Sequence, residues 1–198
     1  MLSRFRDWAN DLIRPLAEAI ARTGVSPNTL TFVGFVVGLF AAFLFSRGEQ
    51  FWAGIILLLV GFFDIIDGAV ARVLGRETAF GGVLDSVVDR YVDFFIFAGI
   101  IYAFAYGGIS EPAFMRGWGW AWCVLAILGS FMVSYIRARA EAAGSGKLDV
   151  GIAERAERLL ILAIGALVGY TPYSVVLIVI LTHLTVFQRL FVARVRLR

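Results

Sequence analysis

The sequence predicts an all-α integral membrane protein with six transmembrane helices and an amphipathic interfacial helix at its N-terminus. Three observations lead to this prediction. Of the 198 residues 60% are hydrophobic, the mean hydropathy is +0.84, and charged residues gather at the ends of apolar segments. Soluble domains are much less apolar, and a membrane barrel would show short alternating strands, which are absent from this sequence. We therefore expect one membrane domain over residues 1–198.

The interfacial helix is expected within residues 1–24. Charged and polar residues fall largely on one side of this segment, and apolar residues fall near the other, as in helices that lie in a membrane interface. The apolar residues near one face are Phe5, Trp8, Leu12, Ile13, Leu16 and Ile20. The stretch GVSPN then ends this helix, and Ser26 or Asn28 is placed to cap the next one.

Six apolar segments follow, each close to the roughly 20 residues that cross a bilayer as a helix. We place them at 28–45, 51–73, 82–105, 118–141, 154–169 and 172–192, within a six-helix bundle that covers residues 28–194. All basic residues except Arg47 and Arg116 fall at or near one side of this bundle. By the positive-inside rule that side is cytoplasmic, together with both termini.

Four aspartates lie at the cytoplasmic ends of the second and third segments. Asp64 and Asp67 are three residues apart, and Asp85 and Asp89 are four apart, so that each pair shares a helix face. Carboxylates that meet in this way repel one another unless a cation neutralises them, and oxygen ligands suit Mg²⁺ or Mn²⁺. Two such ions can stabilise in-line displacement at phosphorus. The alternative is a set of interfacial carboxylates that are solvated or paired with nearby arginines.

The aspartates are part of a longer pattern, Asp64-x2-Asp67-Gly68-x2-Ala71-Arg72-x8-Gly81-x3-Asp85-x3-Asp89. This pattern resembles the motif of the CDP-alcohol phosphotransferase family. The resemblance implies a six-helix enzyme, a homodimer, that moves a phosphoryl-linked group from a CDP-alcohol to a second alcohol and releases CMP.

The resemblance also implies a role for each residue of the pattern. The four aspartates would bind metal, with two Mg²⁺ ions expected and Mn²⁺ as the alternative, and Asp89 would also be the general base. The stretch SPNTLT resembles the first-helix pattern of the family. The residues implied to bind the cytidine diphosphate are Pro27, Asn28, Thr31, Asp64, Asp67, Gly68, Ala71, Arg72, Gly81 and Asp85.

Basic residues at the cytoplasmic ends of the later segments indicate a phosphorylated acceptor, because guanidinium groups bind phosphate in bidentate fashion. The segment SYIRARAEAAGSGKLDVGIAERAER resembles that of family members that transfer a phosphatidyl or archaetidyl group to inositol phosphate. The residues expected to bind the acceptor phosphate are Arg137, Arg155, Arg158 and Arg189.

Three alternatives and two single residues stay open from the sequence. The acceptor could instead be glycerol phosphate or serine, or the chain could be a divalent-cation transporter that uses the aspartates as a pathway. Asp93, one turn beyond Asp89, would bind the acceptor or pair with an arginine, and His183 is expected to be hydrogen-bonded inside the bundle. The expected partners are a CDP-lipid donor, a phosphorylated polyol and membrane lipid, with no nucleic acid.

Overall fold

The computed structural model describes residues 13–198, and all the regular secondary structure in this range is helical. The first helical residues described are 13–22, so the N-terminal part of the predicted interfacial helix lies outside the described residues. The elements that follow are α2 (Pro27–Ser46), α3 (Gln50–Leu74), α4 (Ala79–Ala105), the short 3₁₀ helix η1 (Ala113–Met115), α5 (Gly119–Ala142), α6 (Arg155–Leu167) and α7 (Thr171–Arg196).

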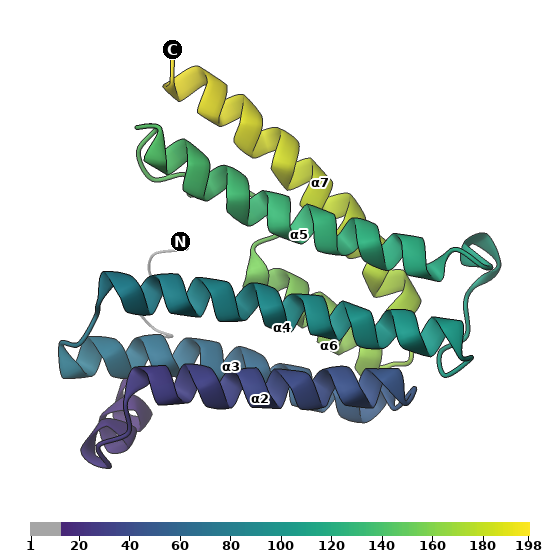
Figure 1. Ribbon diagram of the computed structural model, residues 1–198, viewed down its shortest axis with the longest axis horizontal. Helices are drawn as coiled ribbons and strands as arrows, with labels where there is room; N and C mark the ends of the chain where they lie inside the picture. The colour runs from purple at the N-terminus through teal and green to yellow at the C-terminus, as the bar shows by residue number, and fades with distance from the viewer. Residues whose placement is uncertain (1–12) are drawn as a thin grey trace.

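The long helices form two groups, visible in Figure 1. Helices α2, α3 and α4 run side by side, while α5 and α7 form a pair whose axes diverge from α4 toward the left of the view. Helix α6 links the two groups, since it packs against both α3 and α7. The end of α3 and the start of α4 therefore lie at the same end of the molecule as the C-terminal ends of α5 and α7.

Small residues bring α2 close to α4, and Gly34 of α2 likewise lies against Phe63 of α3. A side chain at Gly99 of α4 would collide with the backbone carbonyl of Ala42 in α2, and a side chain at Gly38 of α2 would collide with Val92 of α4. Helices in membranes associate largely through such close backbone approach, because lipid provides no hydrophobic drive for one helix to meet another. This packing makes α2–α4 a rigid support for the side chains at its end.

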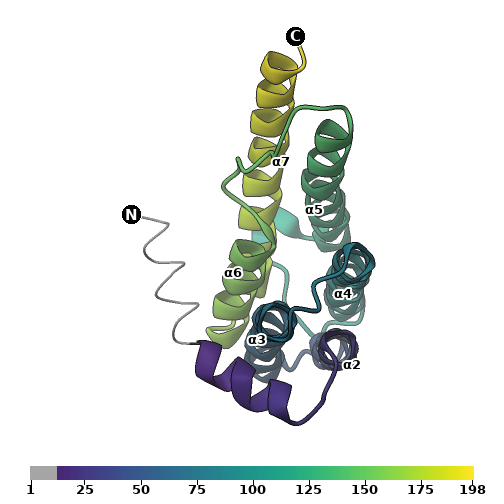
Figure 2. The same ribbon diagram turned by 90° about the vertical axis from the view of Figure 1, so that its left-hand side faces the viewer.

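The helical segment 13–22 lies across the ends of α2 and α3 (Figure 2). Its Ala17 is buried and packs with Leu30 of α2 and with Ile66 and Val70 of α3. Leu16 is exposed, so one face of the segment packs on the protein, while another part of its surface is apolar and uncovered. The segment thus packs directly behind the part of α3 that carries Asp64 and Asp67.

Four helices, α2, α3, α5 and α7, are long and apolar enough to cross a membrane. Helix α4 is long enough to cross a membrane, with 27 residues, but its first half carries four charged residues and is less apolar than those four helices. These residues are Asp85, Asp89, Arg90 and Asp93. Helix α6 has 13 residues, which at about 1.5 Å per residue is roughly 20 Å and shorter than the apolar core of a bilayer. The predicted boundaries agree with the helices to within a few residues. The predicted count of six spans would require α4 and α6 to cross the membrane in addition to these four helices.

Candidate active site

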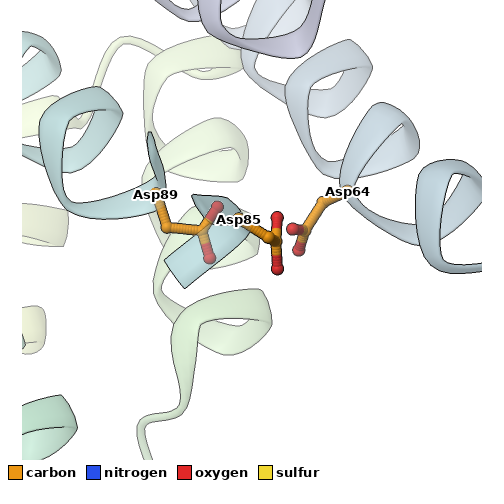
Figure 3. A group of neighbouring side chains, drawn as sticks. All are labelled: Asp64, Asp85 and Asp89. Carbon is orange, nitrogen blue, oxygen red and sulfur yellow. The ribbon is translucent and has the colours of Figure 1, made fainter. Parts of the chain in front are cut away.

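Three of the four aspartates converge at the end of α3 and the start of α4 (Figure 3). Gly75, with a φ of 59°, ends α3 in the left-handed conformation, and Thr78 caps α4 by accepting a hydrogen bond from the Gly81 amide. The chain therefore reverses tightly, and Asp64 comes to face Asp85 and Asp89. One carboxylate oxygen from each of these three residues lies within 4.8 Å of the others.

The donor set of this cluster fits a hard divalent cation. It consists only of carboxylate oxygens, drawn from two helices that α2 holds together, and these are the ligands that Mg²⁺ and Mn²⁺ prefer. Three carboxylates this close repel one another, so the fold has placed them at an electrostatic cost that a bound cation would offset. Asp64, Asp85 and Asp89 are therefore the residues that could hold the metal.

Asp67 stands apart from the cluster of three. Its Oδ2 accepts a 2.7 Å hydrogen bond from the hydroxyl of Thr31 on α2, and the side chain is largely buried. The structure thus connects two predicted site residues from different helices. It does not place the Asp67 carboxylate within the distance that joins the other three, although Asp67 and Asp85 line the same cavity.

This cavity, of about 220 Å³, opens between the starts of α2 and α4 and the end of α3. It brings together eight of the ten residues that the family resemblance assigns to the nucleotide: Pro27, Asn28, Thr31, Asp67, Gly68, Ala71, Gly81 and Asp85. Asp64 instead lines the adjoining narrow space beside Asp89 and Arg155, and Arg72 does not line the cavity.

Four residues of the cavity wall are not among those that the family resemblance assigns to the nucleotide: Arg76, Glu77, Thr78 and Gly82. The first three lie in the eight-residue spacer of the motif, which specifies no residue types. Their place in the turn between α3 and α4 brings them to the wall. Gly82 adjoins Gly81, and such a pair of glycines lets a ligand approach the backbone closely.

Arg155 is the arginine that reaches the aspartate cluster. Its Nη1 lies 2.7 Å from Oδ1 of Asp64 and 2.9 Å from Oδ1 of Asp89, and its side chain is 13% exposed. Arg90 approaches the other oxygen of Asp89 at 3.4 Å. Nη1 and Nε of Arg155 are buried without a hydrogen bond of good geometry, so its contacts are ion pairs rather than directed bonds.

The other three predicted acceptor arginines are engaged with protein groups. Arg158 binds Oδ2 of Asp93 at 2.9 Å, so Asp93 has an arginine partner, which was one of the two roles expected for it. Arg137 is 36% exposed and pairs with Glu141 and Asp149. These pairs leave Arg155 nearest to the cluster.

Arg189 is 2% exposed, and each of its guanidinium nitrogens has a protein partner. Its Nε and Nη1 donate to the carbonyls of Val150 and Val133, each at 2.7 Å, and its Nη2 binds Glu154 at 3.1 Å. One turn earlier on α7, the hydroxyl of Thr185 accepts hydrogen bonds from the amides of Ile152 and Ala153. Both α7 side chains therefore hold the segment that leads into α6 and Arg155.

His183 stays within its own helix, where Nδ1 lies 2.9 Å from the carbonyl oxygen of Val179. This agrees with a residue that is hydrogen-bonded inside the bundle. Among residues 13–198, His183 belongs to no cluster of metal-ligand side chains, as the lone histidine in the sequence indicated.

Comparison with known proteins places this geometry in context. Residues 24–188 match the family described as CDP-alcohol phosphatidyltransferase. Archaetidylinositol phosphate synthase of Pyrococcus horikoshii is 41% identical over 197 residues, which cover 100% of this chain and 98% of that protein. Phosphatidylinositol phosphate synthase of Mycobacteroides abscessus is 38% identical over 163 residues, covering 82% and 71%.

Two solved structures share the fold. The crystal structure of Mycobacterium tuberculosis phosphatidylinositol phosphate synthase with CDP-DAG bound has a TM-score of 0.80 at 30% identity and covers 92% of this chain and 94% of that one. The same enzyme in complex with manganese and citrate has a TM-score of 0.79 at 31% identity, covering 91% and 88%. The likeness thus extends over nearly the whole of both chains.

Proposed function

We propose a reaction for this chain, which belongs to the CDP-alcohol phosphatidyltransferase family: it transfers a phosphatidyl- or archaetidyl-type group from a CDP-activated lipid to inositol phosphate and releases CMP. One observation carries the proposal. Within the cluster of Asp64, Asp85 and Asp89, Asp85 lines the motif-lined cavity, whereas Asp64 and Asp89 contact Arg155 of the predicted acceptor segment. A donor and a phosphorylated acceptor would thus meet at a single cluster of oxygen ligands.

The cavity would bind the cytidine diphosphate part of the donor. Asp67 and Asp85 line it, so that the diphosphate end lies toward the aspartates and the nucleoside toward Pro27 and Asn28. Asp64, Asp85 and Asp89 would hold Mg²⁺ or Mn²⁺, with Asp67 completing the set. When bound, such ions neutralise the diphosphate and stabilise the charge that develops on the departing CMP.

Asp89 is the proposed general base. Its carboxylate would take the proton of the acceptor hydroxyl as that oxygen attacks the lipid-bearing phosphorus, and the phosphorus–oxygen bond to CMP breaks. Its place supports this role, because its Oδ1 lies 2.9 Å from Arg155, on the side where the acceptor phosphate would be bound. Arg155 would orient the acceptor through its phosphate, since a guanidinium binds phosphate oxygens in bidentate fashion.

We propose inositol phosphate as the acceptor because of the arginine-rich segment and the 41% identity to an archaetidylinositol phosphate synthase along its full length. Arg137, Arg155, Arg158 and Arg189 form the proposed acceptor region, with Arg155 nearest to the reacting groups. Glycerol phosphate is the alternative within the family, because it presents a phosphate to the same arginines.

The membrane arrangement is proposed together with the function. The four apolar spans and the family make the chain an integral membrane protein. We propose that α4 and α6 complete a single six-helix domain over residues 28–194, with the cavity and both termini on the cytoplasmic side of the cell membrane. The basic residues of the sequence support this orientation. The segment within residues 1–24 would lie in the interface, and a homodimer is proposed from the family resemblance.

The test is CMP release by purified protein with Mg²⁺ and a CDP-lipid, adding inositol phosphate, glycerol phosphate, free inositol or serine one at a time. Release with inositol phosphate that is lost in Asp89→Asn is the expected result. Release with glycerol phosphate alone would overturn the proposed acceptor and retain the reaction class. No release with any acceptor, from folded protein, would overturn both.

A further inference from the structure

We infer that Arg155 couples acceptor binding to metal binding, because one guanidinium serves both the aspartate cluster and the acceptor phosphate. A phosphorylated acceptor that draws Arg155 away from Asp64 and Asp89 frees their oxygens for a divalent cation, and a bound cation releases Arg155 to the acceptor. The inference rests on the proposed function, since it concerns the same metal and acceptor sites.

The contacts of Arg155 carry the first step. A single atom, Nη1, lies within 2.9 Å of oxygens from both Asp64 and Asp89, which are two of the three residues that make the cation site. A divalent cation bound by those oxygens would lie where the guanidinium now makes its contacts. The two positive groups compete for the same oxygen atoms and repel each other, so they exclude one another at this position.

The second step is that Arg155 is held by charge and not by a fixed set of hydrogen bonds. Two of its buried nitrogens, Nη1 and Nε, lack a hydrogen bond of good geometry, and its next carboxylate, Asp93, is 3.7 Å from Nε. Buried hydrogen-bond donors that lack a partner favour a group whose oxygens can accept hydrogen bonds from several of them together. A phosphate group, with its several oxygens, meets that requirement.

The third step is that the backbone below Arg155 is anchored independently of its side chain. Arg158 binds Asp93 at 2.9 Å and the carbonyl of Ala153 at 3.1 Å, and Glu154 is held by Arg189. Thr185 also binds the amide of Ala153. The Arg155 side chain can therefore exchange partners by rotation while the start of α6 stays in place.

Linkage requires the effect to be reciprocal. If the acceptor tightens metal binding by a given factor, the metal tightens acceptor binding by the same factor, and such couplings typically amount to about 5- to 150-fold. The size of the effect depends on the fraction of the protein in which Arg155 is paired with the aspartates. Only the remaining fraction can bind the metal, and the apparent affinity for the metal is lowered in proportion to that fraction.

The test measures Mn²⁺ binding by the full chain in detergent at constant ionic strength, without any CDP-lipid, by electron paramagnetic resonance of free Mn²⁺. Saturating inositol phosphate is expected to lower the Mn²⁺ Kd of the wild type at least about fivefold. Arg155→Gln is expected to bind Mn²⁺ more tightly than the wild type without acceptor, and to show no further gain with it. Arg139→Gln removes the same charge from an exposed arginine of α5 that lies outside the proposed metal and acceptor sites, so its Kd for Mn²⁺ should equal that of the wild type.

The outcomes separate the inference from the proposed function. Coupling that persists in Arg155→Gln would assign it to direct contact between metal and phosphate, and would overturn the role of Arg155. If inositol phosphate does not change the Kd of the wild type for Mn²⁺, the role of Arg155 would also be overturned, and the proposed metal site would stand. A folded wild type that binds no Mn²⁺ would overturn the inference and the proposed metal site together. The reciprocal measurement, the Kd for inositol phosphate with and without Mn²⁺, uses only wild-type protein and so tests the coupling even if Arg155→Gln fails to fold.

Discussion

The two sides of the candidate site are built in different ways. On the side of α3 and α4, the aspartates project from long continuous helices that glycine contacts hold against α2. On the side of α5 to α7, Arg155 begins a short helix, and an irregular segment held by Thr185 and Arg189 of α7 sets its position. On the first side, helical spacing along the sequence sets which aspartates share a helix face, whereas on the second side the position of Arg155 depends on contacts between residues more than thirty positions apart.

The first and largest test of this comparison is Asp89→Asn, which keeps the shape of the side chain and removes its negative charge. The variant loses a cluster oxygen of full charge and the proposed general base, and we expect CMP release to fall by about 10²- to 10⁴-fold. The variant loses the charge pair with Arg155 but also relieves the repulsion between Asp89 and the other two aspartates, so the melting temperature should stay within a few degrees of that of the wild type. Near-normal CMP release from the variant would remove Asp89 from the proposed chemistry.

Arg189→Gln tests the other side of the site. The change leaves the carbonyls of Val150 and Val133 without their donor, and a buried polar group left unsatisfied costs about 1–3 kcal/mol, so we expect the melting temperature to drop by at least about 5 °C. CMP release should fall by roughly 10²-fold, because the segment that positions Arg155 loses three contacts and small misplacements are costly in catalysis.

The matched control is Arg139→Gln, on an exposed arginine of α5, which should change neither quantity. If Arg189→Gln instead keeps its melting temperature and only raises the KM for the acceptor, Arg189 would bind the acceptor itself. In that case Arg189 would contact the substrate directly, as the aspartates are proposed to do, and would not act by positioning Arg155.

A smaller effect is expected when a methyl group is added to the cavity wall by Gly82→Ala. No atom lies within 4 Å of the added carbon, so the fold should tolerate it, and alanine favours a helix over glycine. If the nucleotide fills the cavity, the KM for the CDP-lipid should rise about tenfold, the usual scale for one methylene in a tight pocket. Gly61→Ala on α3 adds the same methyl with equal room and away from the cavity, and its KM should not change. Equal KM values for the two variants would argue that the donor does not occupy this cavity.

The smallest effect is expected from Thr31→Val, which preserves shape and deletes the hydroxyl that donates to Asp67. A single hydrogen bond is worth about 1 kcal/mol net, so we expect roughly a fivefold loss of kcat/KM. Thr31→Ser keeps the hydroxyl and should retain most of the activity. Full activity in the valine variant would show that the hydrogen bond to Asp67 does not contribute, and a loss in the serine variant would show that the methyl group of Thr31 contributes as well.

Much of the fold and the aspartate side could be predicted from the sequence because both follow from spacing within single helices. The apolar runs placed every long helix to within a few residues, and the intervals between Asp64, Asp85 and Asp89 brought them to one place. The orientation of Asp67 toward Thr31 was not predicted, since it depends on how α2 packs against α3.

The arginine side was harder to predict for the same physical reason. The sequence showed that Arg137, Arg155, Arg158 and Arg189 share one end of the bundle, and it could not show which of them have protein partners. Arg189 is buried against carbonyl groups of two other segments, while Arg155 reaches the aspartates. Only the folded loop between α5 and α6 creates that difference. The length of α6 was also overestimated, because the apolar run of 154–169 continues past the helix that ends at Leu167.

The most direct test of the proposed function is to identify the lipid product. Purified protein would be incubated with Mg²⁺, a CDP-lipid and an equimolar mixture of inositol phosphate and glycerol phosphate, and the extracted lipids would be analysed by mass spectrometry. The proposed function predicts a lipid that carries an inositol phosphate headgroup, formed in amounts equal to the CMP released. A product that carries only glycerol phosphate, or CMP release without any new lipid, would contradict it.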